Sequence, residues 1–202
     1  MIQTPNILID ELPQTVTVCG KVYSINTNFR VSILFELLMQ DDTEEPREKT
    51  VKALKLYYPV IPDDLSAAID AMLWFYGCGK TGNTLKKGYS ERSHNRVYSF
   101  EYDDDYIFSS FISQYDIDLQ QTNYMHWWKF RALFNSLDES NQFVKIMQYR
   151  GMDIGDDMPK EQQKFYSRMK KIYALPKSQN EVEKTAAIED ALMNGGDLTG
   201  IL

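Results

Sequence analysis

YMHWWKFRALFNSL, residues Tyr124–Leu137, is the stretch of sequence that constrains the fold most. It predicts a helix from about Thr122 to Leu137, because at 100° per residue its large apolar side chains gather on one face. Trp128 lies nearly opposite that face, close to Tyr124 and Arg131. The apolar face consists of Trp127, Phe130, Leu133, Phe134 and Leu137.

A helix with aromatic residues on both sides allows two interpretations. The favoured one is a helix at the centre of the core, covered on all sides. In the alternative, Tyr124, Trp128 and Arg131 form a contact patch for a partner, because Trp, Tyr and Arg are the residues that dominate binding interfaces.

Upstream, the segment Thr15–Asn26 (TVTVCGKVYSIN) alternates inward and outward residues on both sides of Gly20-Lys21. Glycine in the first central position predicts a type II′ turn, and therefore a short β-hairpin. A lone hairpin is marginally stable in water, so we expect it to pack on another part of the chain.

The remainder of the first half is typical of helices. Asn26-Thr27-Asn28 offers an N-cap to a helix whose expected face is Val31, Leu34, Phe35 and Leu38. Acidic residues and Pro46 break this pattern, and a polar helix follows to about Tyr58. Pro62 is expected to start a third helix, with Asp63 and Asp64 at its positive end. The expected face of this third helix is Leu65, Ile69, Met72, Leu73 and Tyr76.

The chain becomes polar and glycine-rich from Gly77 to about Val97, which is longer than usual for a loop. We place a boundary there, between 1–97 and 98–202, although the two parts could also form one continuous domain.

In the second part, Asp103 or Asp104 caps a helix carrying Ile107, Phe108, Phe111, Ile112 and Tyr115. After the 122–137 helix, three more are expected: Ser140–Gly151, a basic helix from Pro159 to Pro176, and about Asn180–Asn194. The basic helix has Phe165, Met169, Ile172 and Tyr173 on one side. The predicted fold class is mainly α: a bundle-like multi-helix domain with a small N-terminal hairpin.

Composition narrows the class of protein. A chain of 202 residues can bury a core without disulfides or metals. Its two cysteines, Cys19 and Cys78, have no framework or metal-like spacing, and we interpret them as reduced thiols in a cytoplasm. The N-terminus does not resemble a signal peptide, and no apolar run is long enough to span a membrane. We therefore expect a soluble protein with no membrane partner.

The charge distribution favours protein partners over nucleic acid. The net charge is −7, whereas phosphate binding needs clustered Lys and Arg. Val97–Trp128 contains six acids and no Lys or Arg, and Lys160–Lys177 contains six bases and one acid. An acidic belt and a basic C-terminal helix could associate copies head to tail, which makes a homo-oligomer one hypothesis.

Candidate chemistry is weak throughout. Gly79-Lys80-Thr81 resembles the end of a phosphate-binding loop, but Trp74 stands where the first glycine belongs and a helix leads in instead of a strand. The Asp103–Asp105 run with Asp116 and Asp118 lacks a calcium-loop pattern, and a helix N-terminus explains it better. His126 has no second ligand at helical spacing. We expect no enzyme, no catalytic residues, no metal site and no cofactor; a regulatory or enzymatic use of the Gly77–Val97 loop is the remaining alternative from another class.

Several segments resemble one family. YSFEYDDDYIFSSFISQYDIDLQ (98–120), MHWWKFRALFNSL (125–137) and MQYR (147–150) resemble proteins from siphophages of Gram-positive bacteria and their prophages. The resemblance includes LPQTVTVCGKVYSINTNFR (12–30) and WFYGCGK (74–80), so it covers roughly Leu12 to Gly151. The last fifty residues carry less of it.

These proteins are similar in role to tail assembly chaperones, which are encoded beside the tape measure protein. The resemblance implies a partner that keeps the long, helical tape measure protein soluble while tail-tube subunits polymerise around it. It also implies a location in the host bacterial cytoplasm, absence from the mature virion and, as a further partner, the tail-tube protein. The alternative is a structural tail-completion or connector component of the virion. The family supplies no catalytic residues.

Overall fold

The computed structural model describes residues 5–80 and 96–176, and these residues form seven helices and one two-stranded sheet. The order is β1 (Thr15–Val18), β2 (Lys21–Ser24), α1 (Phe29–Gln40), α2 (Pro46–Tyr57), α3 (Leu65–Tyr76), α5 (Asp104–Tyr115), α6 (Trp127–Asn135), α7 (Gln142–Gly151) and α8 (Lys160–Ile172). The predicted fold class, mainly α with an N-terminal hairpin, is confirmed. The helix expected at 180–194 lies outside the described residues.

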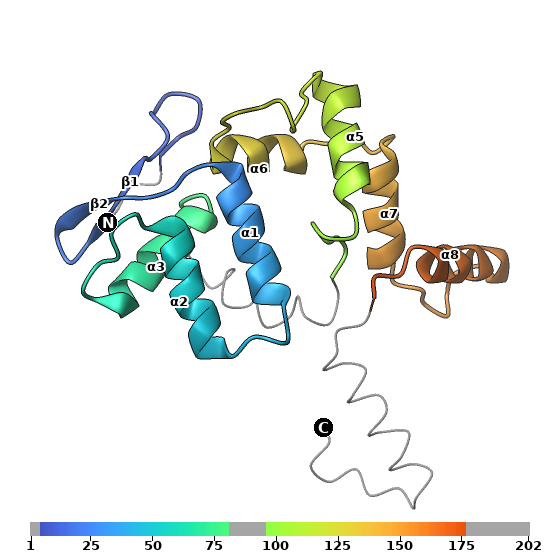
Figure 1. The fold of residues 1–202 in the computed structure, drawn as a ribbon. Helices are drawn as coiled ribbons and strands as arrows, with labels where there is room; N and C mark the ends of the chain where they lie inside the picture. Colours follow the sequence, from blue (N-terminus) through green and yellow to red (C-terminus); the bar gives the residue numbers. More distant parts are fainter. Residues whose placement is uncertain (1–4, 81–95, 177–202) are drawn as a thin grey trace, which may run out of the picture.

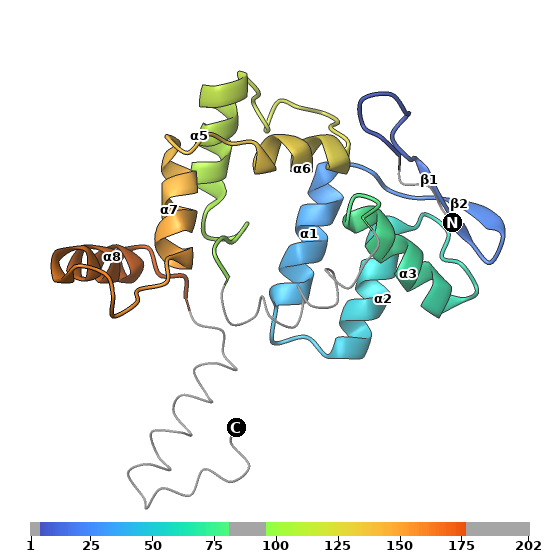
Figure 2. The same cartoon turned by 180° about the vertical axis from the view of Figure 1, so that it is seen from behind.

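The elements form two groups joined by α6. The hairpin, α1, α2 and α3 lie on one side, and α5, α7 and α8 lie on the other, as both views show (Figures 1 and 2). α3 packs on β1 and α2, α1 packs on α2 and α6, and α7 packs between α5 and α8. The hairpin is therefore held by α3, as a marginal two-stranded element requires.

The hairpin turn is one residue earlier than predicted. Val18 pairs with Lys21, so the central residues are Cys19 and Gly20 instead of Gly20 and Lys21. Both have positive φ, 48° and 77°, which is the type I′ pattern and not the predicted type II′. The inward alternation of Val16 and Val18 fixes this register, because a shift by one residue would turn both outward.

The buried faces of α1 and α3 differ from the predicted ones. α1 begins after the predicted cap Asn28, whose side chain accepts the Arg30 backbone N–H, but it buries Phe29, Ser32 and Phe35. Leu34, expected inside, is 51% exposed. The helix is covered from two directions, by α2 and by α6, so the buried side is set by where those helices lie.

α3 begins at Leu65 and not at Pro62. Asp64 is the N-cap, and its carboxylate accepts the Ala67 backbone N–H at 2.9 Å. Pro62 is itself buried ahead of the helix, and Leu65, expected on the inner face, is 52% exposed. The residues that α3 buries are Ala68, Met72, Phe75 and Tyr76.

Aromatic rings connect the two groups through Phe130 of α6, which is fully buried. Its ring stacks on Phe29 of α1 at 4.9 Å and on Phe111 of α5 at 5.0 Å between centroids. One hydrophobic cluster extends from Val16 to Phe143. The core is therefore continuous across both groups, and the division at residue 97 stays a prediction.

Candidate partner-binding surfaces

The three residues of the predicted contact patch do not share an exposed face. Trp128 is buried, with 3% of its surface exposed, and its indole Nε1–H donates to the Phe75 carbonyl at the end of α3, 2.8 Å away. Trp127 is its neighbour in this role, because its indole donates to the Tyr76 carbonyl at 2.8 Å. Both indoles therefore bind carbonyls in the last turn of α3, and the Phe75 carbonyl also accepts the Cys78 backbone N–H at 3.0 Å. This geometry corresponds to the central-core interpretation of the segment.

Tyr124 and Arg131 have more exposed surroundings than Trp128. Tyr124 is 53% exposed and precedes α6, and its hydroxyl lies 2.8 Å from the Thr27 hydroxyl. Arg131 is half-buried on α6, with its guanidinium 5.4 Å from the centre of the Trp127 ring. The helical-wheel argument placed Tyr124 beside Trp128 because it assumed a helix from about residue 122, and this boundary is wrong.

His126 explains why α6 begins five residues later. Its Nδ1 accepts the Trp128 backbone N–H at 3.1 Å as the N-cap, and its Nε2–H donates to the Pro13 carbonyl at 3.0 Å. Burial lowers the pKa of the His126 imidazole, and the bond to Pro13 opposes that effect in part. The backbone also makes a bridge between Asn28 and His126, so the start of α1 and the start of α6 are held together.

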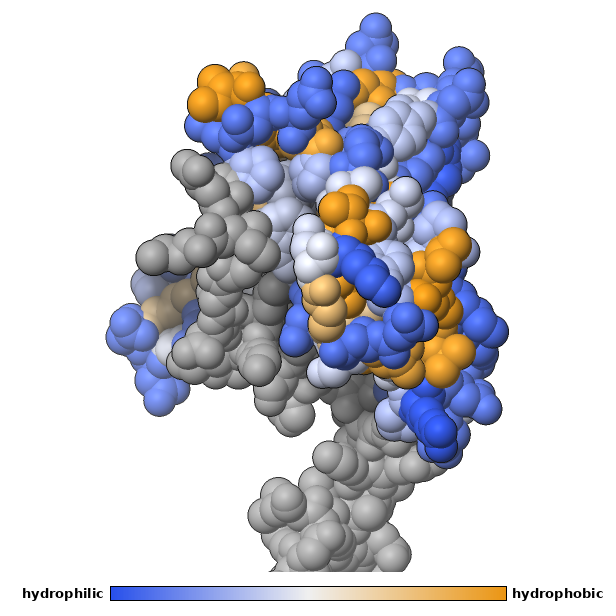
Figure 3. All heavy atoms as spheres, turned by 90° about the vertical axis from the view of Figure 1, so that its left-hand side faces the viewer, coloured by the Kyte–Doolittle hydropathy of each residue, from blue (hydrophilic) through white to orange (hydrophobic). Residues whose placement is uncertain are grey.

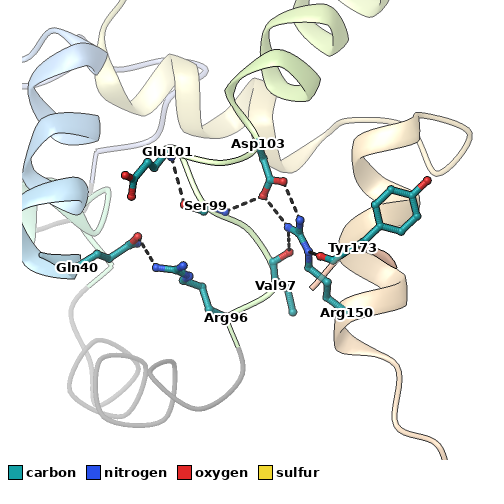
Figure 4. Close-up of polar contacts among 8 residues, drawn as sticks. All are labelled: Gln40, Arg96, Val97, Ser99, Glu101, Asp103, Arg150 and Tyr173. Atoms are coloured by element: carbon teal, nitrogen blue, oxygen red, sulfur yellow. Dashed lines mark hydrogen bonds and ion pairs between the residues drawn. The ribbon is translucent and has the colours of Figure 1, made fainter. Parts of the chain in front are cut away.

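A buried ion pair between Asp103 and Arg150 was not anticipated from the sequence. The Arg150 guanidinium donates to both carboxylate oxygens of Asp103, at 2.6 and 2.8 Å. The Asp103 side chain is 1% exposed and the Arg150 side chain is 9% exposed. The guanidinium also donates to the carbonyls of Val97 and Tyr173 (Figure 4). Asp103 accepts the Ser99 backbone N–H and makes no side-chain cap bond to α5, contrary to one predicted role. Arg150 therefore joins α5, α7, the 97–99 segment and the residue after α8.

The described residues offer little for catalysis. They contain no group of three His, Cys, Asp or Glu side chains able to hold a metal ion. Gly79 donates its N–H to the Trp74 carbonyl in a helix-ending turn, and Thr81 lies outside the described part of the chain. Burial raises the pKa of the Cys78 thiol to about 11, and a protonated thiol is a poor nucleophile. No described helix is both long and apolar enough to cross a membrane.

α8 is the least covered helix, because none of its residues is buried. It has five bases and one acid, and it exposes 49% of Phe165 and 57% of Ile172. Tyr149 of α7 holds it by ring contacts with Phe165, Tyr166 and Tyr173. A hollow of about 520 Å³ runs along the helix and is lined by Gln163, Lys164, Ser167, Arg168, Lys171 and Ile172. The predicted basic helix with an apolar side is present, although it ends at Ile172 and not at Pro176.

Further apolar groups are exposed on the first group of elements. Figure 3 looks at the side formed by the hairpin, α2 and α3, and it shows separate apolar areas between hydrophilic side chains. Leu8 and Ile9, ahead of β1, are 87% and 80% exposed. A shallow groove of about 360 Å³ lies between α1 and α2, lined by Leu34, Leu38, Lys52, Lys55 and Leu56.

Comparison with known proteins gives one result. No curated protein and no solved structure matches the chain significantly. A family model described as "Bacteriophage Gp15 protein" matches residues 8–175, which is most of the chain and includes every described helix. Both residues of the buried ion pair, the two core tryptophans and α8 lie within the match. The chain therefore belongs to the Bacteriophage Gp15 protein family.

Proposed function

We propose that this chain is a tail assembly chaperone, which binds the tape measure protein of its phage and keeps it soluble during tail morphogenesis. Membership of a bacteriophage family supports the setting of this proposal. The tape measure protein is the client that the sequence resemblance implies. On this proposal the chain acts in the host cytoplasm, as a binding protein without catalytic activity, and is left out of the finished virion.

The observation that carries the proposal is the partly exposed apolar side of α8: in the described part of the chain Phe165, which also contacts Tyr149, is 49% exposed and Ile172 is 57% exposed. A long amphipathic helix aggregates unless its apolar stripe is covered, and another helix or groove with matching apolar residues can cover it. Phe165 and Ile172 lie seven residues apart, so they are on nearly the same side of α8, about two helical turns from each other. The lysines and arginine around them would pair with acids beside the client's stripe.

This assignment replaces the patch that the sequence suggested. Trp128 could reach a client only if the core opened, because its ring is buried and its indole is bonded to α3. Tyr124 remains accessible at the surface, but its hydroxyl is engaged with Thr27 and Gln14. Phe165 and Ile172 of α8, in contrast, are about half exposed on one side of a helix and can contact a second helix.

The test is co-expression with the tape measure protein of the same phage. We expect the tape measure protein to become soluble and to co-purify with this chain. The double variant Phe165→Asp/Ile172→Asp should remain folded, since both side chains are about half exposed, and should lose most of the co-purified client. Val60→Asp is the matched control, because Val60 is 70% exposed but lies between α2 and α3.

Two results would overturn the proposal. One is an insoluble tape measure protein beside a normally folded chain. The other is the presence of this chain in stoichiometric amounts in purified virions, measured by mass spectrometry. The second result would favour the alternative function, a tail-completion or connector component.

A further inference from the structure

The segment before β1 presents two aliphatic side chains in an ordered turn. The Asn6 carbonyl accepts the backbone N–H groups of Ile9 and Asp10, at 3.1 and 2.9 Å, and the Asn6 side chain accepts that of Leu8 at 3.0 Å. The Asp10 carboxylate closes the turn by accepting the Asn6 N–H at 2.7 Å. Leu8 and Ile9 thus protrude from a held backbone, and little conformational freedom would be lost if they were bound. We call these two side chains the knob.

The knob is anchored to the body of the protein. Leu12 packs against the core, and the Pro13 carbonyl accepts the His126 Nε2–H. Solitary exposed apolar residues are common on protein surfaces. Two adjacent aliphatic side chains that are each at least 80% exposed, on a turn with four internal hydrogen bonds, form a preorganised apolar projection.

The groove between α1 and α2 is apolar and carries the charge opposite to that beside the knob. Leu34, Leu38 and Leu56 provide its apolar surface, and Lys52 and Lys55 line it. The knob is followed directly by two exposed acids, Asp10 and Glu11. An apolar projection with acids beside it therefore matches an apolar groove with lysines beside it.

One copy cannot bring the two together. The loop that carries the knob lies beyond the hairpin, apart from the α1–α2 pair in both views (Figures 1 and 2). The knob and its anchors at Leu12 and Pro13 are held against the hairpin side of the protein. The groove is therefore open to the knob of another molecule.

We propose that the knob of one copy of this chain binds in the α1–α2 groove of a second copy. Because the two surfaces differ, each copy has one of each, and the contact is heterologous. Such contacts produce a ring when the rotation closes and an open filament when it does not. This inference does not rest on the proposed chaperone function, since it requires no tape measure protein and uses surfaces other than α8.

The test is sedimentation velocity on the full purified chain over a wide concentration range, from about 1 µM to about 1 mM. The knob variant is Leu8→Asp/Ile9→Asp, and the groove variant is Leu34→Glu/Lys55→Glu. All four side chains are exposed, so circular dichroism should show unchanged folding. Lys52 is left in place because it pairs with Glu44 at 2.6 Å within the same copy.

We expect the unmodified chain to assemble with rising concentration and each variant to associate at least about tenfold more weakly, as when an interface anchor is removed. An equimolar mixture of the two variants should form a dimer and nothing larger, since it retains one intact knob and one intact groove. Val60→Asp should assemble like the unmodified chain.

Three results would overturn the inference: an unmodified chain that stays monomeric at the highest concentration, variants that assemble normally, or a mixture that does not dimerise. A further discriminating result concerns the charged surfaces. If Phe165→Asp/Ile172→Asp on α8 abolished assembly while the knob variant retained it, copies would associate through the basic helix and the acidic α5 region instead.

Discussion

Replacement of Arg150 by methionine should destabilise the protein more than any other single change of a charged side chain in its described part. The substitution keeps most of the length of the side chain and removes its charge and its donors. It leaves the Asp103 carboxylate, 1% exposed, without a counter-ion. It also removes the bonds to the carbonyls of Val97 and Tyr173, so the 97–99 segment and the end of α8 lose their shared attachment.

The expected loss follows from the burial of the pair. Removal of one partner from a buried ion pair costs about 3–5 kcal/mol, because the remaining charge stays desolvated without its partner. Asp103 keeps one hydrogen bond, from the Ser99 N–H, which places the estimate near the lower end of that range. For a chain of this size about 3 kcal/mol corresponds to a fall in Tm of roughly 10 °C.

The assay is urea denaturation followed by circular dichroism, with Tm from calorimetry as an independent measurement. Arg168→Met on α8 is the matched control, because Arg168 is exposed and no described acid forms an ion pair with it. A surface change of this kind should alter the free energy of unfolding by less than about 0.5 kcal/mol. The double variant Asp103→Leu/Arg150→Met should recover much of the stability, since an apolar pair leaves no buried charge.

The reasoning is refuted if Arg150→Met and Arg168→Met unfold at the same urea concentration. It is also refuted if the double variant is less stable than Arg150→Met, which would mean that Asp103→Leu adds its own loss of stability. That outcome would mean that the pair contributes through packing volume and not through charge.

Two further predictions concern α6. Because burial lowers the pKa of His126 in the folded chain below the ordinary imidazole value of 6.5, the unfolded chain binds more protons in mild acid. The stabilising contribution of neutral His126 is complete above pH 6.5 and is lost as the pH falls below that value. The urea midpoint should therefore drop between pH 7.5 and 5.5, and His126→Asn, which keeps a cap acceptor, should reduce the drop; an unchanged pH dependence contradicts this. Trp128→Phe should lower the free energy of unfolding by about 1 kcal/mol, because the buried Phe75 carbonyl loses the indole donor and keeps only the Cys78 backbone N–H. Trp74→Phe should cost less in the same denaturation experiment, since the buried Trp74 Nε1–H has no hydrogen-bond partner among the described residues, and equal losses would contradict the assignment.

Local patterns predicted those features that depend on near neighbours in the chain. The N-cap at Asn28, the end of α2 and the approximate span of α7 all follow from short-range rules, and each was predicted to within a residue or two. The position of α6 was also correct, but its first turn was not. His126 caps the helix because Trp128 and Pro13 are both within reach of its ring, and only the folded chain places Pro13 there.

For the candidate binding residues, too, local patterns were not sufficient, and contacts between distant segments decided which of them are exposed. A helical wheel placed Trp128 opposite the apolar face of α6, which favoured a covered core helix but left an exposed contact patch as the alternative. α3 covers the other side and supplies the carbonyl that the indole needs, so the residue is buried. The apolar side of α8 was predicted from the sequence, and in the described part of the chain no residue of that helix is fully buried.

By itself the sequence determined the class of fold, the order of its helices and the family to which the chain belongs, because periodicity, capping residues and motif order are local properties. Only the tertiary structure decided which side of each helix is buried, the pairing of Asp103 with Arg150 across 47 residues, and the exposure of Leu8 and Ile9. These features depend on contacts between segments far apart in the chain. Periodicity states that a helix has an apolar side, but the neighbours that pack against it determine whether that side is covered.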